Sequence, residues 1–218
     1  MLSQYRARIN LNIYDSPECK SLATQAAAGR YLKILSKQEN DAALEVMCCE
    51  DNYRGWLRSD DLHLELVEEP YAAIALCRSE IVPCLPQIIE FVQRAKLQPN
   101  QYLWGGTVAP NYDCSGLMQA AFAASGVWLP RDAYQQYNFT ERVTLDFLLL
   151  GDLVFFGTPE KIDHVGLYLG AGQYIHSSGR DTGRNGIAVD ILQDEGDSIG
   201  RSLYQRLWGF GRVMGSFN

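Results

Sequence analysis

Apolar and polar residues alternate over short stretches throughout the first third of the chain. Between residues 5 and 13 the odd positions are apolar or aromatic and the even positions are polar, a period of two that predicts a half-buried strand. Further short apolar stretches, separated by polar turn residues, cover 30–35, 42–49, 54–57 and 62–67. Strands of this length and spacing predict a small all-β barrel.

The apolar spacing then becomes helical. A stripe of apolar residues at i, i+3, i+4 and i+7 predicts an amphipathic helix over residues 86–97. Pro86 suits the first turn of this helix and Pro99 its end. A second helix-forming run follows Cys114 and ends at Gly126, which suits the left-handed position just past a helix end.

Buried strands are expected at 151–156, 163–170 and 173–177, and a last strand at 208–214. The glycines of residues 170–172 favour a short hairpin loop between the second and third of these strands. Helices followed by antiparallel strands indicate an α+β arrangement. We expect two domains, 1–75 and 84–218, packed together because no Gly/Ser-rich linker separates them.

Cys114 begins the second predicted helix, in the segment Tyr112-Asp113-Cys114-Ser115-Gly116. A cysteine at this position lies beside unpaired backbone N–H groups at the positive end of the helix dipole. This environment stabilises a thiolate, so we expect the pKa of Cys114 to fall below the usual ~8.5. The other five cysteines show no Cys-x-x-Cys spacing and are expected to be packing residues.

Two of the three histidines lie on the predicted hairpin. A hairpin centred on residue 170 places His164 directly opposite His176, with their Cβ atoms about 4.5–5.5 Å apart. A pairing shifted by one residue would instead point them to opposite faces. The pattern favours Cys114 as nucleophile, His164 as general base and His176 as the residue that orients the base. His63 lies on the polar face of its strand and is expected at the surface.

The composition of the chain argues against some classes of binding partner. The apolar fraction of 47% and the charged fraction of 21% are ordinary for a soluble globular chain. A net charge of −7 without a run of Lys or Arg argues against nucleic acid as a partner. The chain starts without an apolar signal core and has no run of 18 apolar residues, so we expect no membrane partner and a cytoplasmic location. No cofactor or resident metal is expected, and the oligomeric state stays open.

The segment Asp51-Asn52-Tyr53-Arg54-Gly55-Trp56-Leu57 resembles the aspartate-x-tyrosine-x-glycine-tryptophan signature of bacterial SH3-like domains. With the opening strand and the turn Asp15-Ser16-Pro17, the resemblance covers residues 1 to about 70. It implies a small SH3-like β-barrel, in which Trp56 is expected to be a core aromatic residue.

Motifs of the second domain resemble the NlpC family of bacterial cysteine peptidases, which have a papain-like fold. The resemblance covers residues 86–214 and implies a Cys-His-His triad on Cys114, His164 and His176. It also implies that Tyr102 lies near the thiol and supports the oxyanion hole, where the backbone N–H of Cys114 is a second donor. The motifs occur in family order: Tyr102-x-Trp-Gly-Gly, Asp113-Cys114-Ser115-Gly116, Gly151-Asp152-Leu153-Val154-Phe155-Phe156, Asp163-His164-Val165-Gly166 and Tyr174-Ile175-His176.

The family cleaves peptidoglycan stem peptides, commonly between γ-D-glutamate and a diamino acid. The domain order resembles recycling enzymes of murein peptides that accept L-Ala-γ-D-Glu-diamino acid peptides with a free N-terminal L-alanine. The resemblance implies that Asp113 binds the substrate ammonium and that Tyr53 closes the end of the cleft. Asp113 could instead serve only as a helix cap, and Ser115 could help in either role. Arg131 and Asp132 match a family Arg-Asp-Ala segment near the cleft, where they shape the substrate site or pair with each other.

Three other functions stay open. Related folds use the same thioester chemistry to transfer acyl groups to amines, so the chain could be an acyltransferase or amidase. Cys114, His164 and His176 could instead form a non-catalytic zinc site. In the third alternative the SH3-like domain recruits a protein partner and the second domain is degenerate, against which the intact Cys-His-His set argues.

Overall fold

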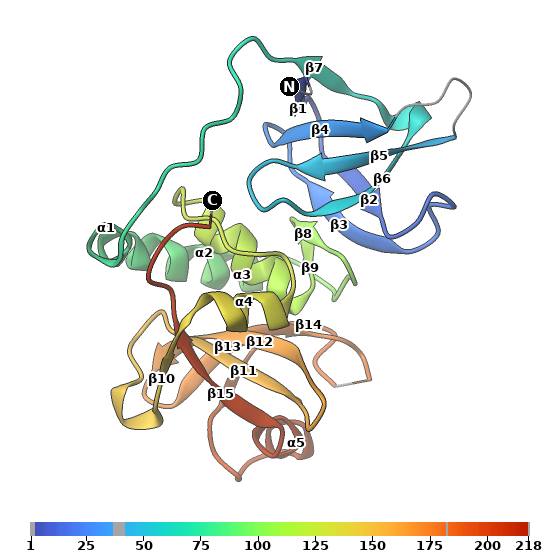
Figure 1. Cartoon of the computed structure of the whole chain (residues 1–218). Helices are drawn as coiled ribbons and strands as arrows, with labels where there is room; N and C mark the ends of the chain where they lie inside the picture. Colours follow the sequence, from blue (N-terminus) through green and yellow to red (C-terminus); the bar gives the residue numbers. More distant parts are fainter. Residues whose placement is uncertain (1–2, 37–41, 182, 218) are drawn as a thin grey trace.

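The computed structural model describes residues 3–36, 42–181 and 183–217. The first part of the chain forms a seven-stranded sheet, and the second part packs helices on a six-stranded sheet (Figure 1). A connection without helix or strand, residues 67–76, joins the two parts. The predicted architecture, a small β domain followed by an α+β domain, is confirmed.

The β domain contains seven short strands in the order β3-β2-β6-β5-β4-β1-β7. The single strand predicted over residues 5–13 is wrong, because the chain bends at residues 8–10 and leaves Ile9 47% exposed. Strand β3 was not predicted, since its sequence Leu-Ala-Thr-Gln-Ala carries little apolar alternation. The elements are β1 (Gln4–Ala7), β2 (Leu11–Tyr14), β3 (Leu22–Ala26), β4 (Tyr31–Ser36), β5 (Ala43–Cys48), β6 (Arg54–Arg58), the 3-10 helix Ser59–Asp61 and β7 (Leu64–Leu66).

The signature segment of the β domain contains a glycine that the packing requires. A Cβ atom built on Gly55 would lie 2.5 Å from Cγ2 of Ile13 and 2.7 Å from the carbonyl oxygen of Tyr14. Gly55 and Leu57 are buried, whereas Trp56 between them is only half-buried. The expectation that Trp56 is a core residue is wrong, because strand alternation turns it away from the face that Gly55 and Leu57 occupy.

The α+β domain begins with its helices, as predicted. The helix expected over 86–97 runs from Leu85 to Leu97 and buries Ile88 and Val92. The helix expected after Cys114 begins at that residue, and Gly126 beyond its end has φ +78°. The elements are α1 (Arg78–Ile81), the 3-10 helix Val82–Cys84, α2 (Leu85–Leu97), β8 (Thr107–Val108), β9 (Asn111–Tyr112), α3 (Cys114–Ala123) and α4 (Ala133–Phe139).

The six-stranded sheet has the order β10-β15-β11-β12-β13-β14 and is antiparallel throughout. On one face, Val165 and Leu167 share a core with Met118 and Phe122 of α3. The other face carries Tyr174, which clusters with residues of α5. The elements are β10 (Glu141–Val143), the 3-10 helix Leu145–Phe147, β11 (Leu153–Thr158), β12 (Lys161–Gly170), β13 (Gln173–Ser178), β14 (Gly186–Ile191), α5 (Ser198–Tyr204) and β15 (Leu207–Arg212).

Hydrogen bonds between side chains and backbone join the two domains. Oε1 of Gln25, at the end of β3, accepts from the backbone N–H groups of Thr107 and Val108, at 3.1 and 3.2 Å. The side-chain amide of Gln119, in α3, donates to Oδ2 of Asp51 at 2.8 Å in a buried position. The β domain is therefore fixed directly against the helix that begins at Cys114.

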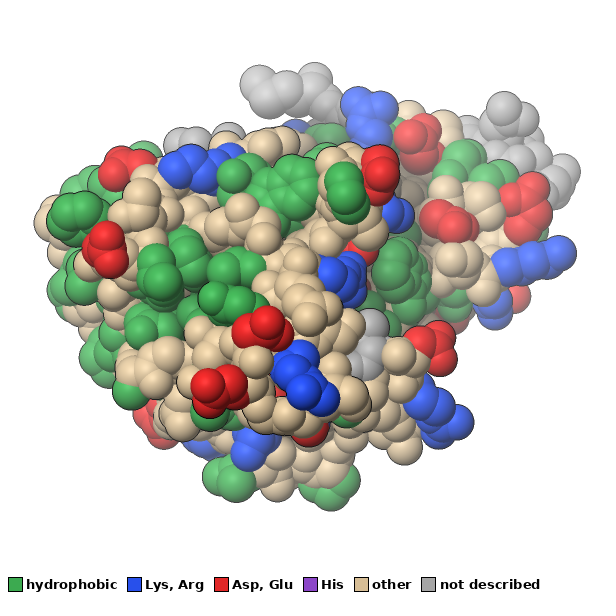
Figure 2. All heavy atoms as spheres, turned by 90° about the horizontal axis from the view of Figure 1, so that it is seen from below, with side chains coloured by type: hydrophobic (Ala, Val, Ile, Leu, Met, Phe, Trp, Pro, Cys, Tyr) green, Lys and Arg blue, Asp and Glu red, His purple; other side chains and the backbone are tan. Residues whose placement is uncertain are grey.

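The surface carries no single-sign patch on the face seen in Figure 2, where Lys and Arg side chains are interspersed with Asp and Glu. His63 is exposed, as expected. Among the residues that the structure describes, every helix is too short or too polar to cross a lipid bilayer.

Candidate active site

Cys114 is the first residue of α3, and Asp113 caps that helix. Oδ1 of Asp113 accepts from the backbone N–H of Gly116 at 2.6 Å. The thiol is 6% exposed and donates to the carbonyl oxygen of Asp163 at an S···O distance of 3.8 Å. The nucleophile predicted from the sequence therefore lies at a helix N-terminus, next to the residue that precedes His164.

Burial decides the resting state of the thiol. Desolvation and the charge of Asp113 raise the pKa of Cys114 to about 12, although backbone N–H groups of Ser115 and Val165 act in the opposite direction. The expected lowering of the Cys114 pKa by the helix terminus is wrong for this site, because the capping carboxylate offsets the helix dipole and burial penalises the thiolate. Cys114 is therefore a neutral thiol that needs a base.

His164 and His176 form a hydrogen bond. Nε2 of His164 lies 2.8 Å from Nδ1 of His176, with both side chains buried. The predicted direct opposition is wrong: Leu167 pairs with Ile175 and Tyr168 with Tyr174, and the same register puts His176 opposite Gly166. The shift is two residues, which keeps both histidines on one face and makes them diagonal neighbours.

Gly166, which has no side chain, leaves room for the diagonal contact between His164 and His176. A Cβ atom built on Gly166 would lie 3.2 Å from Cβ of His176. On the other side of His176, the directly paired residue is Ala188 of β14, again a small side chain. The ring of His176 is therefore free to meet longer side chains diagonally on both neighbouring strands.

The diagonal neighbour on β14 is Asp190, which the sequence analysis did not identify. Its Oδ2 lies 2.8 Å from Nε2 of His176. Tyr174 pairs directly with Asp190, so Asp190 is two residues away from the position opposite His176. An alternating strand after residue 185 that carries one aspartate was the available signal, but it becomes informative only once the strand order is known.

The environment keeps His164 uncharged. Burial, the ring of His176 and the guanidinium of Arg206 lower the pKa of His164 well below 6.5. Its Nε2 is engaged by His176, so Nδ1 is the ring nitrogen that remains to accept a proton. The site at rest thus pairs a neutral thiol with a neutral imidazole, which is the arrangement for general-base activation of a nucleophile.

Tyr102 lines the same cavity as Cys114 and His164. Burial, followed by the neighbouring Cys114 and Asp113, raises the pKa of Tyr102, so its hydroxyl keeps its hydrogen. A neutral phenol is a hydrogen-bond donor of the kind that an oxyanion needs. The predicted role of Tyr102 in the oxyanion hole agrees with this chemistry and stays a prediction.

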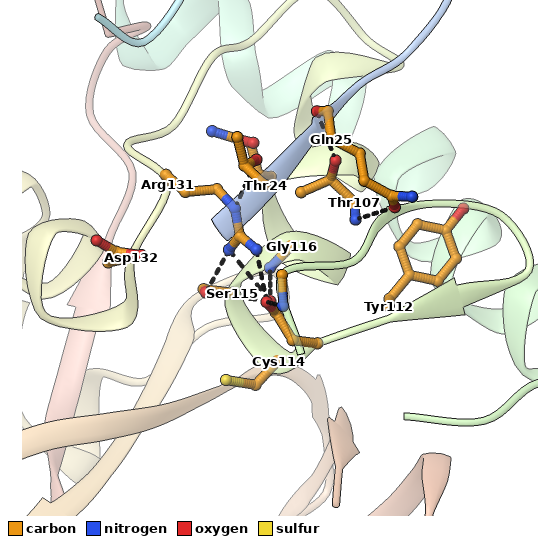
Figure 3. Close-up of polar contacts among 12 residues, drawn as sticks. Thr24, Gln25, Thr107, Tyr112, Cys114, Ser115, Gly116, Arg131 and Asp132 are labelled. Carbon is orange, nitrogen blue, oxygen red and sulfur yellow. Dashed lines mark hydrogen bonds and ion pairs between the residues drawn. The ribbon is translucent and has the colours of Figure 1, made fainter. Parts of the chain in front are cut away.

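Arg131 and Asp113 form a buried ion pair, which replaces the alternative that Arg131 pairs with Asp132. The guanidinium NH2 lies 2.5 Å from Oδ2 of Asp113, and NH1 donates to Oγ of Ser115 at 3.0 Å. Nε donates to Oγ1 of Thr24, across the domain boundary, at 2.9 Å. Figure 3 shows these bonds converging on Arg131, while the Asp132 side chain lies apart from them.

A cavity of about 700 Å³ contains the reactive groups. Its lining includes Tyr53 of the β domain, which lies near Asp132, and Lys161 and Arg206 of the α+β domain. Burial and the nearby Asp132 raise the pKa of Tyr53 to about 12, and burial raises the pKa of Asp132. The geometry therefore brings together all nine residues named from the sequence: Tyr53, Tyr102, Asp113, Cys114, Ser115, Arg131, Asp132, His164 and His176.

A zinc site on the triad is not favoured by this geometry. Nε2 of His164 and Nδ1 of His176 face each other at 2.8 Å, and Nε2 of His176 faces Asp190. Within residues 3–36, 42–181 and 183–217, no three His, Cys, Asp or Glu side chains are arranged to hold a metal ion.

Comparison with protein families agrees with both domains. Residues 13–62 match the bacterial dipeptidyl-peptidase SH3 domain, and residues 99–201 match the NlpC/P60 family. The chain carries an NlpC/P60 domain behind a bacterial SH3 domain. The NlpC/P60 match includes Cys114, His164, His176 and Asp190. NlpC/P60 relatives of the chain are hydrolases of the endopeptidase type by name.

Curated relatives match about half of the chain. The chain is 43% identical over 94 residues to gamma-D-glutamyl-L-lysine dipeptidyl-peptidase of Bacillus subtilis, which covers 42% of this chain and 30% of the relative. It is 40% identical over 112 residues to the probable endopeptidase p60 of Listeria seeligeri, covering 51% of this chain and 19% of the relative. The matches thus span less than a third of either relative's length.

A solved structure shows the same fold. The crystal structure of an NlpC/P60 family protein from Bacillus cereus superimposes with a TM-score of 0.52 at 22% identity. The alignment covers 97% of this chain and 63% of the other. The pair of domains, and not only the NlpC/P60 part, therefore has a structural counterpart.

Proposed function

We propose that this protein is a cysteine endopeptidase that hydrolyses the γ-D-glutamyl–diamino acid bond of peptidoglycan stem peptides with a free N-terminal L-alanine. The observation that carries the proposal is the hydrogen bond between His164 and His176, in a cavity that His164 and the buried Cys114 line together with residues of the SH3 domain. The similarity to a relative named for gamma-D-glutamyl-L-lysine cleavage supports the substrate class.

Apart from water, the reaction needs only groups of this chain. His164 accepts the thiol proton at Nδ1 while the sulfur of Cys114 attacks the γ-carbonyl carbon. The hydroxyl of Tyr102 and the backbone N–H of Cys114 stabilise the oxyanion. His164 then donates the proton to the departing amine of the diamino acid. The γ-glutamyl acyl group stays bound to Cys114 as a thioester. His164 then takes a proton from water, which attacks the thioester and releases the L-Ala-γ-D-Glu product with a free γ-carboxylate. The proton on His164 returns to the sulfur of Cys114 and restores the thiol.

The end of the cavity next to the SH3 domain suits an ammonium group. Asp113 and Asp132 carry two negative charges there against the single positive charge of Arg131. Both Asp113 oxygens already accept hydrogen bonds, from Arg131 and from backbone N–H groups. Asp132 therefore supplies the negative charge that pairs directly with the substrate ammonium. Asp113, already paired with Arg131, affects the ammonium only through longer-range electrostatics. Tyr53 blocks the position that a sugar would occupy on the alanine nitrogen.

The experiment compares L-Ala-γ-D-Glu-diaminopimelate with the same peptide acetylated at its N-terminus, using wild type and Cys114→Ala. Cleavage of the free peptide alone, abolished in the variant, is the expected result. Asp132→Asn should raise KM for the free peptide about tenfold or more by removing a charge-assisted contact. Equal cleavage of both peptides would remove the free-amine requirement while keeping the peptidase.

The products separate the two thioester chemistries. Hydrolysis releases L-Ala-γ-D-Glu, whereas an acyltransferase would join the same acyl group to an added amine such as glycinamide. Transfer product in excess of hydrolysis product would favour the transferase. The soluble substrate fits a cytoplasmic enzyme of murein peptide recycling, and cell fractionation with an antibody against the protein tests that location.

A further inference from the structure

Three side chains, those of Asp190, Arg184 and Asp197, extend the line of hydrogen bonds beyond the two histidines. Asp190 accepts from His176 through Oδ2, and Arg184 binds both oxygens of Asp190, with Nε 3.1 Å from Oδ2. NH1 of Arg184 lies 2.7 Å from Oδ2 of Asp197, which caps α5 by accepting from Gly200 N–H at 2.8 Å. The line of hydrogen bonds that begins at His164 therefore ends at α5, the helix whose residues cluster with Tyr174.

With both imidazole rings neutral, the line has only one consistent set of hydrogen positions. A carboxylate can only accept, so Nε2 of His176 must be the ring nitrogen that carries hydrogen. A neutral imidazole has one N–H, and Nδ1 of His176 must then accept from Nε2–H of His164. That assignment leaves Nδ1 of His164 with a lone pair, which is what a base for the Cys114 thiol requires.

The opposite tautomers would disable the base. If Nδ1 of His176 carried the hydrogen, its Nε2 lone pair would face the Asp190 carboxylate, and Nε2 of His164 would become an acceptor. His164 would then present Nδ1–H toward the thiol and could not take its proton. The donor and acceptor roles along the whole series of hydrogen bonds are thus set by Asp190, at the end remote from the sulfur.

We propose that Asp190 is a positioning residue of the peptidase, holding His176 and through it His164 in the tautomers that make His164 a base. Arg184 keeps Asp190 ionised and oriented by binding both of its oxygens. Although burial acts to raise it, hydrogen bonds from His176 and Arg184 bring the pKa of Asp190 to about 2. The inference deepens the proposed function and rests on it only for the kinetic part of its test.

Nuclear magnetic resonance reads the tautomers without any substrate. Long-range ¹H–¹⁵N correlation of the ¹⁵N-labelled protein shows which ring nitrogen of each histidine carries hydrogen. The chain has three histidines, and the exposed His63 is an internal reference for an unconstrained ring. His164→Gln assigns the two remaining sets of signals. We expect wild-type His164 and His176 both to carry hydrogen on Nε2.

Asp190→Asn is the decisive variant. Arg184 should donate hydrogen bonds to the amide oxygen at position 190, which leaves the amide NH₂ group facing Nε2 of His176. Nε2 of His176 must then accept, and the tautomers of both His176 and His164 are inverted. In a serine-protease triad, the corresponding aspartate-to-asparagine change costs about 10⁴-fold in kcat. Here the carboxylate acts through a second ring, and we expect a loss of about 10²-fold or more in kcat, with KM little changed. Asp194→Asn, an exposed carboxylate on the following loop, is the matched control and should leave tautomers and kcat unchanged.

Two results would overturn the proposal. One is a wild-type spectrum in which His176 carries hydrogen on Nδ1, a result that needs no variant to fold. The other is a folded Asp190→Asn protein with wild-type tautomers and a kcat within about twofold of wild type. Failure of wild type to cleave any stem peptide would instead refute the proposed function, and the spectra would still decide the role of Asp190.

Discussion

Gly166 lies opposite His176 in the β12–β13 hairpin, and a Cβ atom built on it would lie 3.2 Å from the Cβ of that histidine and 2.9 Å from the carbonyl oxygen of Ile175. The absence of a side chain at this position is what allows His164 to reach His176 diagonally. The contact between His164 and His176 therefore depends on a residue with no functional group.

Gly166→Ala should lower kcat by at least about tenfold and destabilise the fold by about 1–3 kcal/mol, the usual cost of overpacking. Kinetics on the free stem peptide and urea denaturation measure the two effects. Gly126→Ala is the control, because a Cβ there meets nothing within 4 Å. Its φ of +78° costs about 1 kcal/mol of stability, with kcat unchanged. Wild-type kcat in folded Gly166→Ala would show that the histidines do not need this space.

The raised Cys114 pKa predicts a particular pH dependence of its alkylation. Only the thiolate reacts, so its rate with iodoacetamide should rise about tenfold per pH unit from pH 6 upward, without a plateau below pH 9. Mass spectrometry of individual peptides separates Cys114 from the other cysteines; the exposed Cys77 is the reference. A plateau near pH 6 would instead indicate a thiolate–imidazolium pair at rest.

Asp190 should contribute to the loss of unfolding free energy between pH 4 and pH 2. Its folded-state pKa of about 2 lies below the ordinary 3.8, so its ionised form stabilises the fold above pH 4. This contribution is lost as the pH falls through 2. Urea denaturation should therefore show a difference in unfolding free energy between wild type and Asp190→Asn that shrinks from pH 4 to pH 2. A difference independent of pH would mean that Asp190 contributes only through packing.

Arg131→Met should be strongly destabilising, by about 3–5 kcal/mol, because it leaves the Asp113 carboxylate buried without its partner. Arg131 is 2% exposed and its partner 5% exposed, so solvent screening is small. The double variant Arg131→Met/Asp113→Asn should recover part of this loss, since the unpaired charge is gone. Denaturation of the three proteins gives the comparison. Equal stability of the single and double variants would contradict the argument.

Much of the candidate site could be predicted from local sequence pattern. Cys114 was predicted at the start of its helix, and His164 and His176 on one hairpin face, because periodicity and turn residues report local geometry. The exact pairing was not predicted, since the hairpin register moved by two residues relative to a symmetric loop centred on Gly170. Hairpin loops fix register through backbone angles that the glycines alone do not specify.

Other features depend on distant parts of the chain. Asp190 became part of the site only when β14 paired with β13, and Thr24 only when the SH3 domain packed on the NlpC/P60 domain. The pKa of Cys114 was predicted in the wrong direction, because a helix start can be read from sequence whereas burial cannot. Tertiary burial outweighed the local dipole.

The hydrogen bond from Arg131 to Thr24 has a consequence for how such proteins can be recombined. A cut within residues 67–76 would leave Cys114, His164 and His176 on one fragment. It would still remove one of the two hydroxyl partners of the buried guanidinium, and it would take away the residues of the β domain that line the cleft. The two domains are therefore not interchangeable cassettes. A chimera that borrows its SH3 domain from a relative needs a hydroxyl at the Thr24 position before its nucleophile will be held as it is here.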